Sequence, residues 1–483
     1  MVSNIQDDEV AHNCHTETTP LLSNSEPLES DTSGSWGAEL WLLLQYSVPL
    51  IATYLLQYSY SVITTFVAGH LSADALAAAS IGMTTMNIVG FATIEGMATA
   101  LDTLCAQAYG SGNLPGVGLH VQKMLLLMTL AIIPIGIFWI CSPWVLSLFV
   151  RQHHLAVMAG SFLRVSLIGL PGYASFEAGK RFLQAQGDFK AALFAISICT
   201  PINALLSWFF VFKMGMGLDG AALGVALTNN LRPVLLLIYI LLPMGKWSRQ
   251  CWGGFSRDAL SKWGPMVRLS LAGFAVNLGE WAAFEVVTFS TSYLSTNHLA
   301  AQSVVMTISI VSWHIPFSMS VAISTRIGHL IGGGLVTTAQ RAAVLYAVVC
   351  TVVGSVDGLI ILVLRNQLLT FFSEDDAVVG IASKTMLTVA AFQIIDAIIC
   401  CTNGLLRGLG RQSFAACVVF VVNYLGAVPL ALWLELGSPA LELNGVWIGL
   451  GSGMVLTAVI EGIYMKSMRW QDCVASVKSR EGL

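Results

Sequence analysis

Charged side chains are scarce in this sequence. Asp, Glu, Lys and Arg make up only 10% of its 483 residues, whereas soluble domains carry about 25%. Hydrophobic residues account for 55% of the chain, and the formal net charge is -4. Neither this charge nor any dense basic tract indicates a nucleic-acid partner. The composition is that of a protein that crosses a lipid bilayer many times.

Signatures of several other protein classes are also missing. The sequence has no G-x-x-x-x-G-K-[ST] phosphate-binding loop, no Ser/His/Asp constellation and no N-x-[ST] glycosylation sequon. Residues 215–220 match G-x-G-x-x-G, but no strand precedes them, so close packing in a turn is the better interpretation. The ten cysteines are scattered without metal-type spacing. We therefore expect no enzymatic activity, no metal site and no cofactor.

Long apolar stretches recur along the chain. Each is near the roughly 20 residues that a helix needs to cross the bilayer, and a helix satisfies its own backbone there. Twelve are present, at 39–68, 76–108, 119–142, 155–186, 190–212, 220–244, 264–293, 299–330, 339–364, 378–408, 413–435 and 442–467. Sixteen Lys and Arg residues fall on one side of this arrangement, and only Arg151, Lys213, Arg365 and Lys384 on the other. Cytoplasmic loops retain such residues, so both termini are predicted to be cytoplasmic.

The first 36 residues are polar, acidic and rich in Ser, Thr and Pro. This composition predicts a disordered tail, and the tail lacks the apolar core of a signal peptide. The segment from Glu17 to Leu22 resembles an acidic dileucine sorting signal. We expect residence in a vacuolar or plasma membrane, with a featureless tail as the alternative interpretation.

The two halves of the chain repeat one another. Six of ten positions are identical between Leu71–Ser80 and Leu294–Ser303, which lie 223 residues apart, and Gly187 aligns with Gly410 at the same offset. Six spans per half is an even number, so the repeats are parallel and related by a pseudo-two-fold axis along the membrane normal. The predicted division is a disordered cytoplasmic tail (1–36), an N-terminal six-helix lobe (37–244), a cytoplasmic linker (245–263), a C-terminal six-helix lobe (264–468) and a cytoplasmic tail (469–483).

Two carboxylates, Glu280 and Glu285, interrupt the apolar stretch from Leu269 to Tyr293. A charge at bilayer depth is costly and marks a functional site. With about 100° per residue, one helical sector collects Glu280, Phe284, Asn277, Thr288, Trp281 and Glu285. Carboxylates with aromatic neighbours can hold a cation or a proton. We predict a shared cavity, and a hydrogen-bonded pair that serves helix packing is the alternative.

Further polar residues lie within predicted spans. Asp396 has Gln393, Cys400 and Asn403 at helical spacing and is predicted to supply a third charge. Glu95 and Asp102 share a face of the second span near Asn87, where structural packing is the alternative. His314 offers a titratable ring before Pro316, although a satisfied core residue is the usual reading of a lone histidine. Gln57 aligns with Glu280 in the repeat, and Tyr58 and Tyr60 are candidates to shape the pocket.

Five motifs together resemble the multidrug and toxic compound extrusion (MATE) family, in its eukaryotic, fungal branch. They are Gly69-His-Leu, the stretch from Ala100 to Gly110, Glu280-Trp-Ala-Ala-Phe-Glu285, Arg326-Ile-Gly328 and the stretch from Asn403 to Gly410. The resemblance covers about residues 38–468. It implies a two-lobed antiporter of twelve helices that exports organic molecules, usually cations, in exchange for protons or sodium.

The resemblance also implies roles for individual residues. Glu280, Glu285 and Asp396 match the acidic positions that eukaryotic members use for coupling and cation binding, and Asn87 and Asp102 match polar positions of the N-terminal lobe. The first span has no acid at its middle, which disfavours a proton mechanism in that lobe.

The expected function is a monomeric secondary antiporter in a lipid bilayer. It would export organic cations, xenobiotics or metabolites from the cytoplasm in exchange for protons, without a cofactor. A sodium-coupled exporter and a flippase for lipids or neutral metabolites are the alternatives within the same superfamily. A receptor or scaffold that transports nothing is the alternative from another class.

Overall fold

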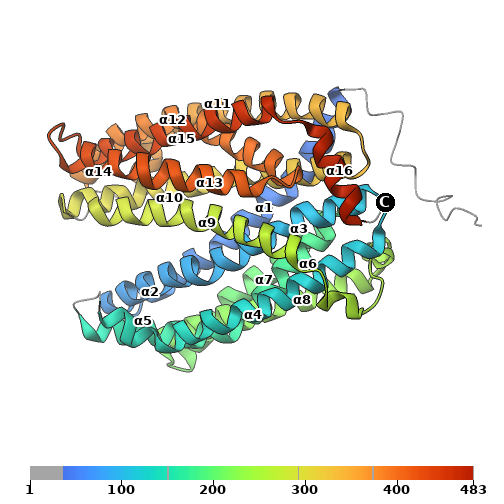
Figure 1. Ribbon diagram of the computed structural model, residues 1–483. Helices are drawn as coiled ribbons and strands as arrows, with labels where there is room; N and C mark the ends of the chain where they lie inside the picture. Colours follow the sequence, from blue (N-terminus) through green and yellow to red (C-terminus); the bar gives the residue numbers. More distant parts are fainter. Residues whose placement is uncertain (1–35, 149–151, 292, 373–374, 482–483) are drawn as a thin grey trace, which may run out of the picture.

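The computed structural model describes residues 36–148, 152–291, 293–372 and 375–481, and these are almost wholly helical (Figure 1). The predicted tail, apart from Trp36, and its dileucine-like motif lie outside the described residues. The first lobe contains α1 (Trp36–Gly69), α2 (Ala73–Thr85), α3 (Ala92–Gly110), α4 (Leu114–Ser147), α5 (His153–Ser166), α6 (Leu170–Gln184), α7 (Lys190–Trp208) and α8 (Gly217–Leu241). The second contains α9 (Gly264–Thr291), α10 (Thr296–Gly332), α11 (Val336–Phe372), α12 (Asp376–Gly408), α13 (Gln412–Val422), α14 (Val428–Leu436) and α15 (Glu442–Ser467).

Short π and 3-10 turns join some of these helices into longer spans. The π turn η1 (Met86–Phe91) joins α2 to α3, and η6 (Asn423–Ala427) joins α13 to α14. The π turn η3 (Phe209–Lys213) extends α7, and the 3-10 turn η2 (Leu167–Gly169) joins α5 to α6. Two more 3-10 turns, η4 (Pro243–Cys251) and η5 (Arg257–Leu260), lie between α8 and α9.

The twelve predicted spans correspond to helices of the structure. Eleven helical units among the described residues are long and apolar enough to cross a membrane. The twelfth, α9, has 28 residues but is less apolar, because Asn277, Glu280 and Glu285 lie within it. The least hydrophobic crossing is therefore the one that carries the predicted site.

The sequence repeat is visible in the backbone. Ser72 caps α2 and Ser295 caps α10, each accepting a hydrogen bond from the amide three residues later. Gly187 and Gly410 both adopt a positive φ, of 82° and 73°, a conformation that glycine adopts without steric cost. Two lobes of six crossings each follow, related by the pseudo-two-fold axis that the repeat predicts.

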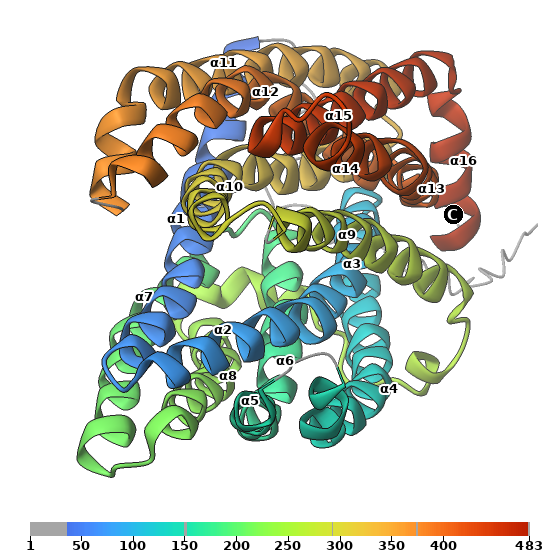
Figure 2. The same ribbon diagram turned by 90° about the vertical axis from the view of Figure 1, so that its left-hand side faces the viewer.

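The first helix of each lobe starts against the other lobe. Figure 2 shows α1 running from beside α10 and α11 down to α7, and Glu39 near its start pairs with Arg326 of α10. In the same way, the first half of α9 packs on α3: a Cβ at Gly96 would lie only 2.7 Å from the Cα of Phe274. Small residues at this crossing allow the two backbones to touch.

The lobes meet at one end of the bundle, where helix α16 (Trp470–Glu481) lies (Figure 1). We call this the α16 end. The segment 469–483 was predicted only as a tail, yet most of it is a helix whose Trp470, Cys473 and Val477 are buried. From α15 of the second lobe it reaches the first lobe, where Asn113 donates a hydrogen bond of 2.8 Å to Glu481.

Candidate functional site

A cavity of about 190 Å³ lies inside the second lobe, among α9, α10, α12, α13 and α15. A cavity of this size can hold on the order of ten water molecules or one small organic molecule. The polar residues that line it include Thr99, Asn277, Glu280, Ser309, Ser320, Gln393, Asp396, Asn403, Arg407 and Gln412. Gln393, Asp396, Cys400 and Asn403 all reach it from α12, because their spacing of three to four residues places them on one helix face.

Two predicted carboxylates share this cavity. Glu280 of α9 and Asp396 of α12 both line it, and their charges interact electrostatically. A third acid, Glu461 of α15, is fully buried and accepts a hydrogen bond of 2.6 Å from Thr402; its charge also acts on Glu280. Glu461 was not predicted, although an acid within the span 442–467 is the same signal that identified Glu280.

The structure places Glu285 elsewhere, contrary to the prediction of a shared cavity. Glu285 is half-buried and is not among the residues that line the cavity with Glu280. Five residues advance a helix by about 140° beyond a full turn, so the two carboxylates point in widely different directions. Another acid near this end of the lobe is Glu435 of α14, which is buried and accepts a hydrogen bond from Ser290.

Aromatic rings form much of the cavity wall. Trp281 and Phe284 line it as predicted. The ring of Trp281 lies 6.5 Å from that of Trp313 in an edge-to-face arrangement, and the ring of Phe284 lies 6.1 Å from that of Trp447. A cation in this space would meet both carboxylates and aromatic faces.

Three other predicted residues do not reach the cavity lining. Tyr60 is buried under Arg232, whose guanidinium carbon lies 4.1 Å from the ring centroid. Tyr58 lies beside His314, with 5.7 Å between ring centroids. Nδ1 of His314 lies 2.6 Å from the carbonyl oxygen of Ile310. His314 therefore belongs to the contact between α1 and α10, and its proton role stays a prediction.

Two of the polar residues predicted in the first lobe, Gln57 and Glu95, lie together and apart from the cavity lining. Glu95 accepts a hydrogen bond from the hydroxyl of Tyr173 and lies 3.5 Å from the amide nitrogen of Gln57. Asn87 is half-buried in the π turn η1. Near this cluster Glu177 pairs with Lys180 at 2.8 Å and with Arg181. The interior of the first lobe thus holds its own cations.

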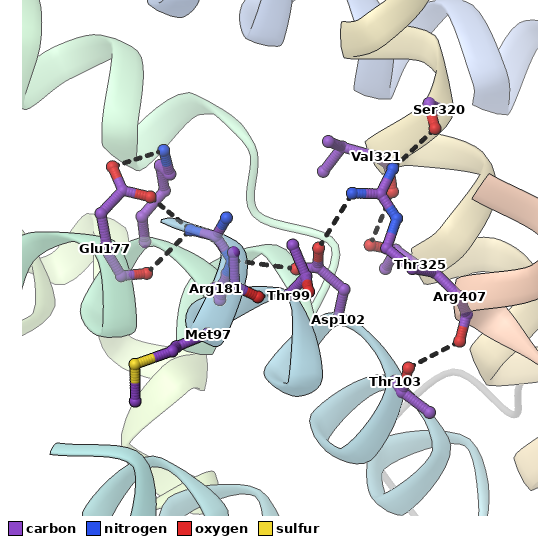
Figure 3. A network of polar contacts seen from close by, with 12 residues as sticks. Met97, Thr99, Asp102, Thr103, Glu177, Arg181, Ser320, Val321, Thr325 and Arg407 are labelled. Atoms are coloured by element: carbon purple, nitrogen blue, oxygen red, sulfur yellow. Dashed lines mark hydrogen bonds and ion pairs between the residues drawn. The ribbon is translucent and has the colours of Figure 1, made fainter. Parts of the chain in front are cut away.

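Asp102 joins the two lobes (Figure 3). One carboxylate oxygen lies 3.3 Å from Nε of Arg181 in its own lobe, and the other lies 3.7 Å from Nη1 of Arg407 in the second lobe. Arg407 was not predicted as a site residue, because its ion pair with Asp102 links helices that are distant in sequence. It is the one cationic side chain among the described residues that line the cavity.

Hydrogen bonds between the lobes surround this ion pair. Thr103 donates to the carbonyl oxygen of Arg407 at 2.6 Å, and Gln107 donates to that of Gly408 at 2.7 Å. Gln412 donates to the carbonyl oxygen of Thr99 at 3.0 Å. Since Thr99, Arg407 and Gln412 also line the cavity, the lobe contact forms its floor.

The sequence matches the MatE family model over residues 49–209 and 274–433, one match in each half. An uncharacterised transporter of Schizosaccharomyces pombe is 38% identical over 95% of this chain and 85% of its own length. Protein DETOXIFICATION 16 of Arabidopsis thaliana is 31% identical over 94% and 91%. Human multidrug and toxin extrusion protein 2 is 25% identical over 97% and 82%.

Solved structures agree with these relatives. The crystal structure of a eukaryotic MATE transporter, AtDTX14, superposes with a TM-score of 0.87 at 26% identity, over 92% of this chain and 99% of that one. A MOP superfamily transporter from Pyrococcus furiosus has the same fold, with a TM-score of 0.79 at 16% identity over 90% and 96%.

Proposed function

The chain belongs to the MatE family of multidrug and toxin extrusion transporters, and from this membership we propose that it exports organic cations or metabolites from the cytoplasm in exchange for protons. The observation that carries the proposal is the pair of carboxylates, Glu280 and Asp396, facing one aromatic-walled cavity. The roles of these residues, the antiport and the coupling ion are all part of the proposal.

The excess of negative charge in the cavity supports the proposal that protons and cargo compete for the same carboxylates. Glu280, Asp396 and the neighbouring Glu461 supply up to three negative charges, while Arg407 supplies one positive charge and also faces Asp102. Uncompensated charge away from water is costly, so the carboxylates gain from binding either protons or a cation. One set of groups then serves both ligands in turn, which is the basis of exchange.

The predicted orientation assigns one end of the bundle to the cytoplasm. Lys and Arg are concentrated in the loops at the α16 end, which we assign to the cytoplasm. The lobes are in contact there, so this conformation is closed toward the cytoplasm. The vacuolar or plasma membrane stays our expectation for its location, and either places an acidic or external compartment on the other side.

Transport by the purified protein in proteoliposomes tests the proposal. With a proton gradient imposed, wild type should move a fluorescent organic cation, and Glu280→Gln or Asp396→Asn should lower the rate by about tenfold or more. The matched control is Glu435→Gln, because that acid is buried in the same lobe but is absent from the cavity lining. Equal rates in wild type and Glu280→Gln would refute the proposal.

The same assay separates the alternatives. A sodium-coupled exporter would respond to a sodium gradient and not to a proton gradient. A flippase would move a labelled lipid or neutral metabolite, and neutralising Glu280 would leave that flux intact. A receptor or scaffold would show no gradient-driven flux. The predicted part of Glu285 in coupling is tested by Glu285→Gln in the same series.

A further inference from the structure

We propose that Arg407 couples the charge of the cavity to the contact between the lobes. The inference rests on the proposed function, and it adds a positioning residue. When protons or a cationic cargo neutralise the cavity carboxylates, Arg407 pairs with Asp102 and the lobes stay closed at the α16 end. When the carboxylates are bare, they compete with Asp102 for Arg407, and the closure weakens.

Arg407 lies where the cavity borders the contact between the lobes. Its side chain lines the cavity with Glu280 and Asp396, and Nη1 faces Asp102 of the first lobe. Nη2 donates a hydrogen bond of 2.6 Å to Ser320, which also lines the cavity. One guanidinium group therefore contacts the site and the opposite lobe at once.

Arg407 and Asp102 face one another, but they do not form a close ion pair. Its separation of 3.7 Å exceeds the 2.7–2.9 Å that is typical of charge-assisted hydrogen bonds. Oδ2 of Asp102 and Nε of Arg407 are both buried without a hydrogen-bond partner. Asp102 also has a nearer cation in Arg181, at 3.3 Å. Asp102 can thus release Arg407 without losing its counter-charge.

The groups around Arg407 explain why the cavity competes for it. Each helix packed against it contributes a charged, titratable or polar group, namely Asp102 of α3 with Arg181 of α6 behind it, Glu280 of α9, Ser320 of α10, Asp396 and Cys400 of α12, Gln412 of α13 and Glu461 of α15. Glu280 already lies within electrostatic range of Arg407. Several acids lie on the cavity side of Arg407, whereas Asp102 is the one acid that faces it from the described part of the first lobe. Ionisation of the cavity acids therefore changes the position at which the guanidinium group is most stable.

Movement of Arg407 acts directly on the lobe contact. The backbone carbonyls of Arg407 and Gly408 accept the hydrogen bonds of Thr103 and Gln107 from the first lobe. The Arg407 side chain and the carbonyls that accept these bonds belong to one turn of α12, so a rearrangement of that turn would alter both together. The energetic link between cavity and closure is thereby confined to a single turn of α12.

Distances between spin labels across the α16 end test the inference. Cysteines would replace the exposed Lys190 and Gln340, at the starts of α7 and α11, in a background where Cys14, Cys141 and Cys417 are serine. In lipid nanodiscs without substrate, the ratio of closed to open molecules should fall about tenfold from pH 5.5 to 8.5, within the 5- to 150-fold range of typical couplings. Tetraphenylphosphonium, a permanent cation, should restore the closed distance at pH 8.5.

Three variants separate a charge switch from a structural role. Arg407→Gln should abolish the pH response, and the conservative Arg407→Lys should retain much of it. Thr103→Val removes a neutral hydrogen bond between the same elements, so it should weaken closure equally at every pH. An unchanged response in Arg407→Gln, or its loss in Thr103→Val, would overturn the inference.

The outcomes also distinguish this inference from the proposed function. Proton-driven transport together with a pH-insensitive label distance would refute the coupling through Arg407 and leave the antiport standing. A pH-dependent label distance that Arg407→Gln abolishes, in a protein without proton-driven flux, would support the coupling through Arg407 and refute the antiport.

Discussion

The two lobes share a fold, but their interiors are occupied in opposite ways. In the first lobe, Glu177 is paired with Lys180 and Arg181, so built-in cations occupy the space around the acid. In the second lobe, Glu280 and Asp396 face a cavity. The acid of the first lobe thus has two paired cations, whereas the two acids of the second lobe face open space whose described lining residues include a single cationic side chain, that of Arg407.

Equivalent positions show how the difference arises. At the repeat offset of 223 residues, Glu280 corresponds to Gln57 and Asp396 to Tyr173. In the first lobe these two neutral side chains contact one another, with 3.5 Å between the amide nitrogen of Gln57 and the hydroxyl of Tyr173. A large phenol ring thus stands in the first lobe at the position where the second lobe has a short carboxylate facing its cavity.

Stability gives the strongest test of this comparison. Glu177→Gln should cost about 3–5 kcal/mol in the free energy of unfolding, because it leaves Lys180 and Arg181 buried without their counter-charge. The same substitution at Glu280 should cost less than about 1 kcal/mol, since it removes an acid that faces a cavity. Denaturant unfolding of both purified variants measures the difference, and equal losses would break the distinction between the two interiors.

The affinity for cargo should show an effect of intermediate size. Trp281→Ala should weaken binding of tetraphenylphosphonium by about ten- to thirtyfold, given that a desolvated cation–π contact contributes about 2 kcal/mol and tenfold corresponds to about 1.4 kcal/mol. Tyr60→Ala is the matched control, because its ring already stacks on Arg232. Calorimetry on both variants measures the affinities. A similar loss in the two would show that the first lobe also binds cargo.

The docking of α16 on the first lobe gives the smallest expected effect. Burial by itself would raise the pKa of Glu481, but hydrogen bonds from His120 and Asn113 and the nearby charge of Arg480 outweigh it and lower the pKa from 4.5 to about 2. A lowered pKa means that the ionised group stabilises docking, fully above about pH 4.5 and progressively less as the pH falls toward 2.

Hydrogen exchange of the α16 amides measures this effect. Their protection should decline between about pH 4.5 and 2 in wild type. In Glu481→Gln, protection should be lower at neutral pH and should lose this dependence. The same pH profile in the variant would assign the link between the lobes to other groups. One candidate is the hydrogen bond of 2.5 Å that Nη2 of Arg480 donates to Oε1 of Gln107.

Much of the fold was predictable because hydrophobic stretches and an internal repeat can both be found without knowing which helices pack together. The spans, the two lobes and the alignment of Gly187 with Gly410 are confirmed. The helix α16 was missed although Trp470, Cys473 and Val477 recur at helical spacing, because the segment is polar overall. The exact limits of the lobes and tails stay predictions.

The site was predictable where one helix face carried the signal. Glu280 and Asp396 do line one cavity, and their neighbours Asn277, Trp281 and Phe284 join them. Glu285 was placed wrongly because a broad helical sector was read as a single direction. Arg407 was missed because its relation to Glu280 depends on packing between distant helices, which spacing along one helix does not reveal. Glu461 was overlooked, although an acid within an apolar span is the signal that identified Glu280.

The crossing of α1 between the lobes has a consequence for biosynthesis. The partner of Glu39 is Arg326, 287 residues later. At about 5–20 residues per second, the ribosome needs roughly 15–60 seconds to reach it. The first helix to emerge is therefore among the last to complete its contacts. Tyr46 in its amino-terminal half packs on Phe189 of the first lobe, but the face of this half toward α10 and α11 stays uncovered until the second lobe is made. A nascent chain stalled after α8 would present that half-helix as an open surface for chaperones and quality-control factors.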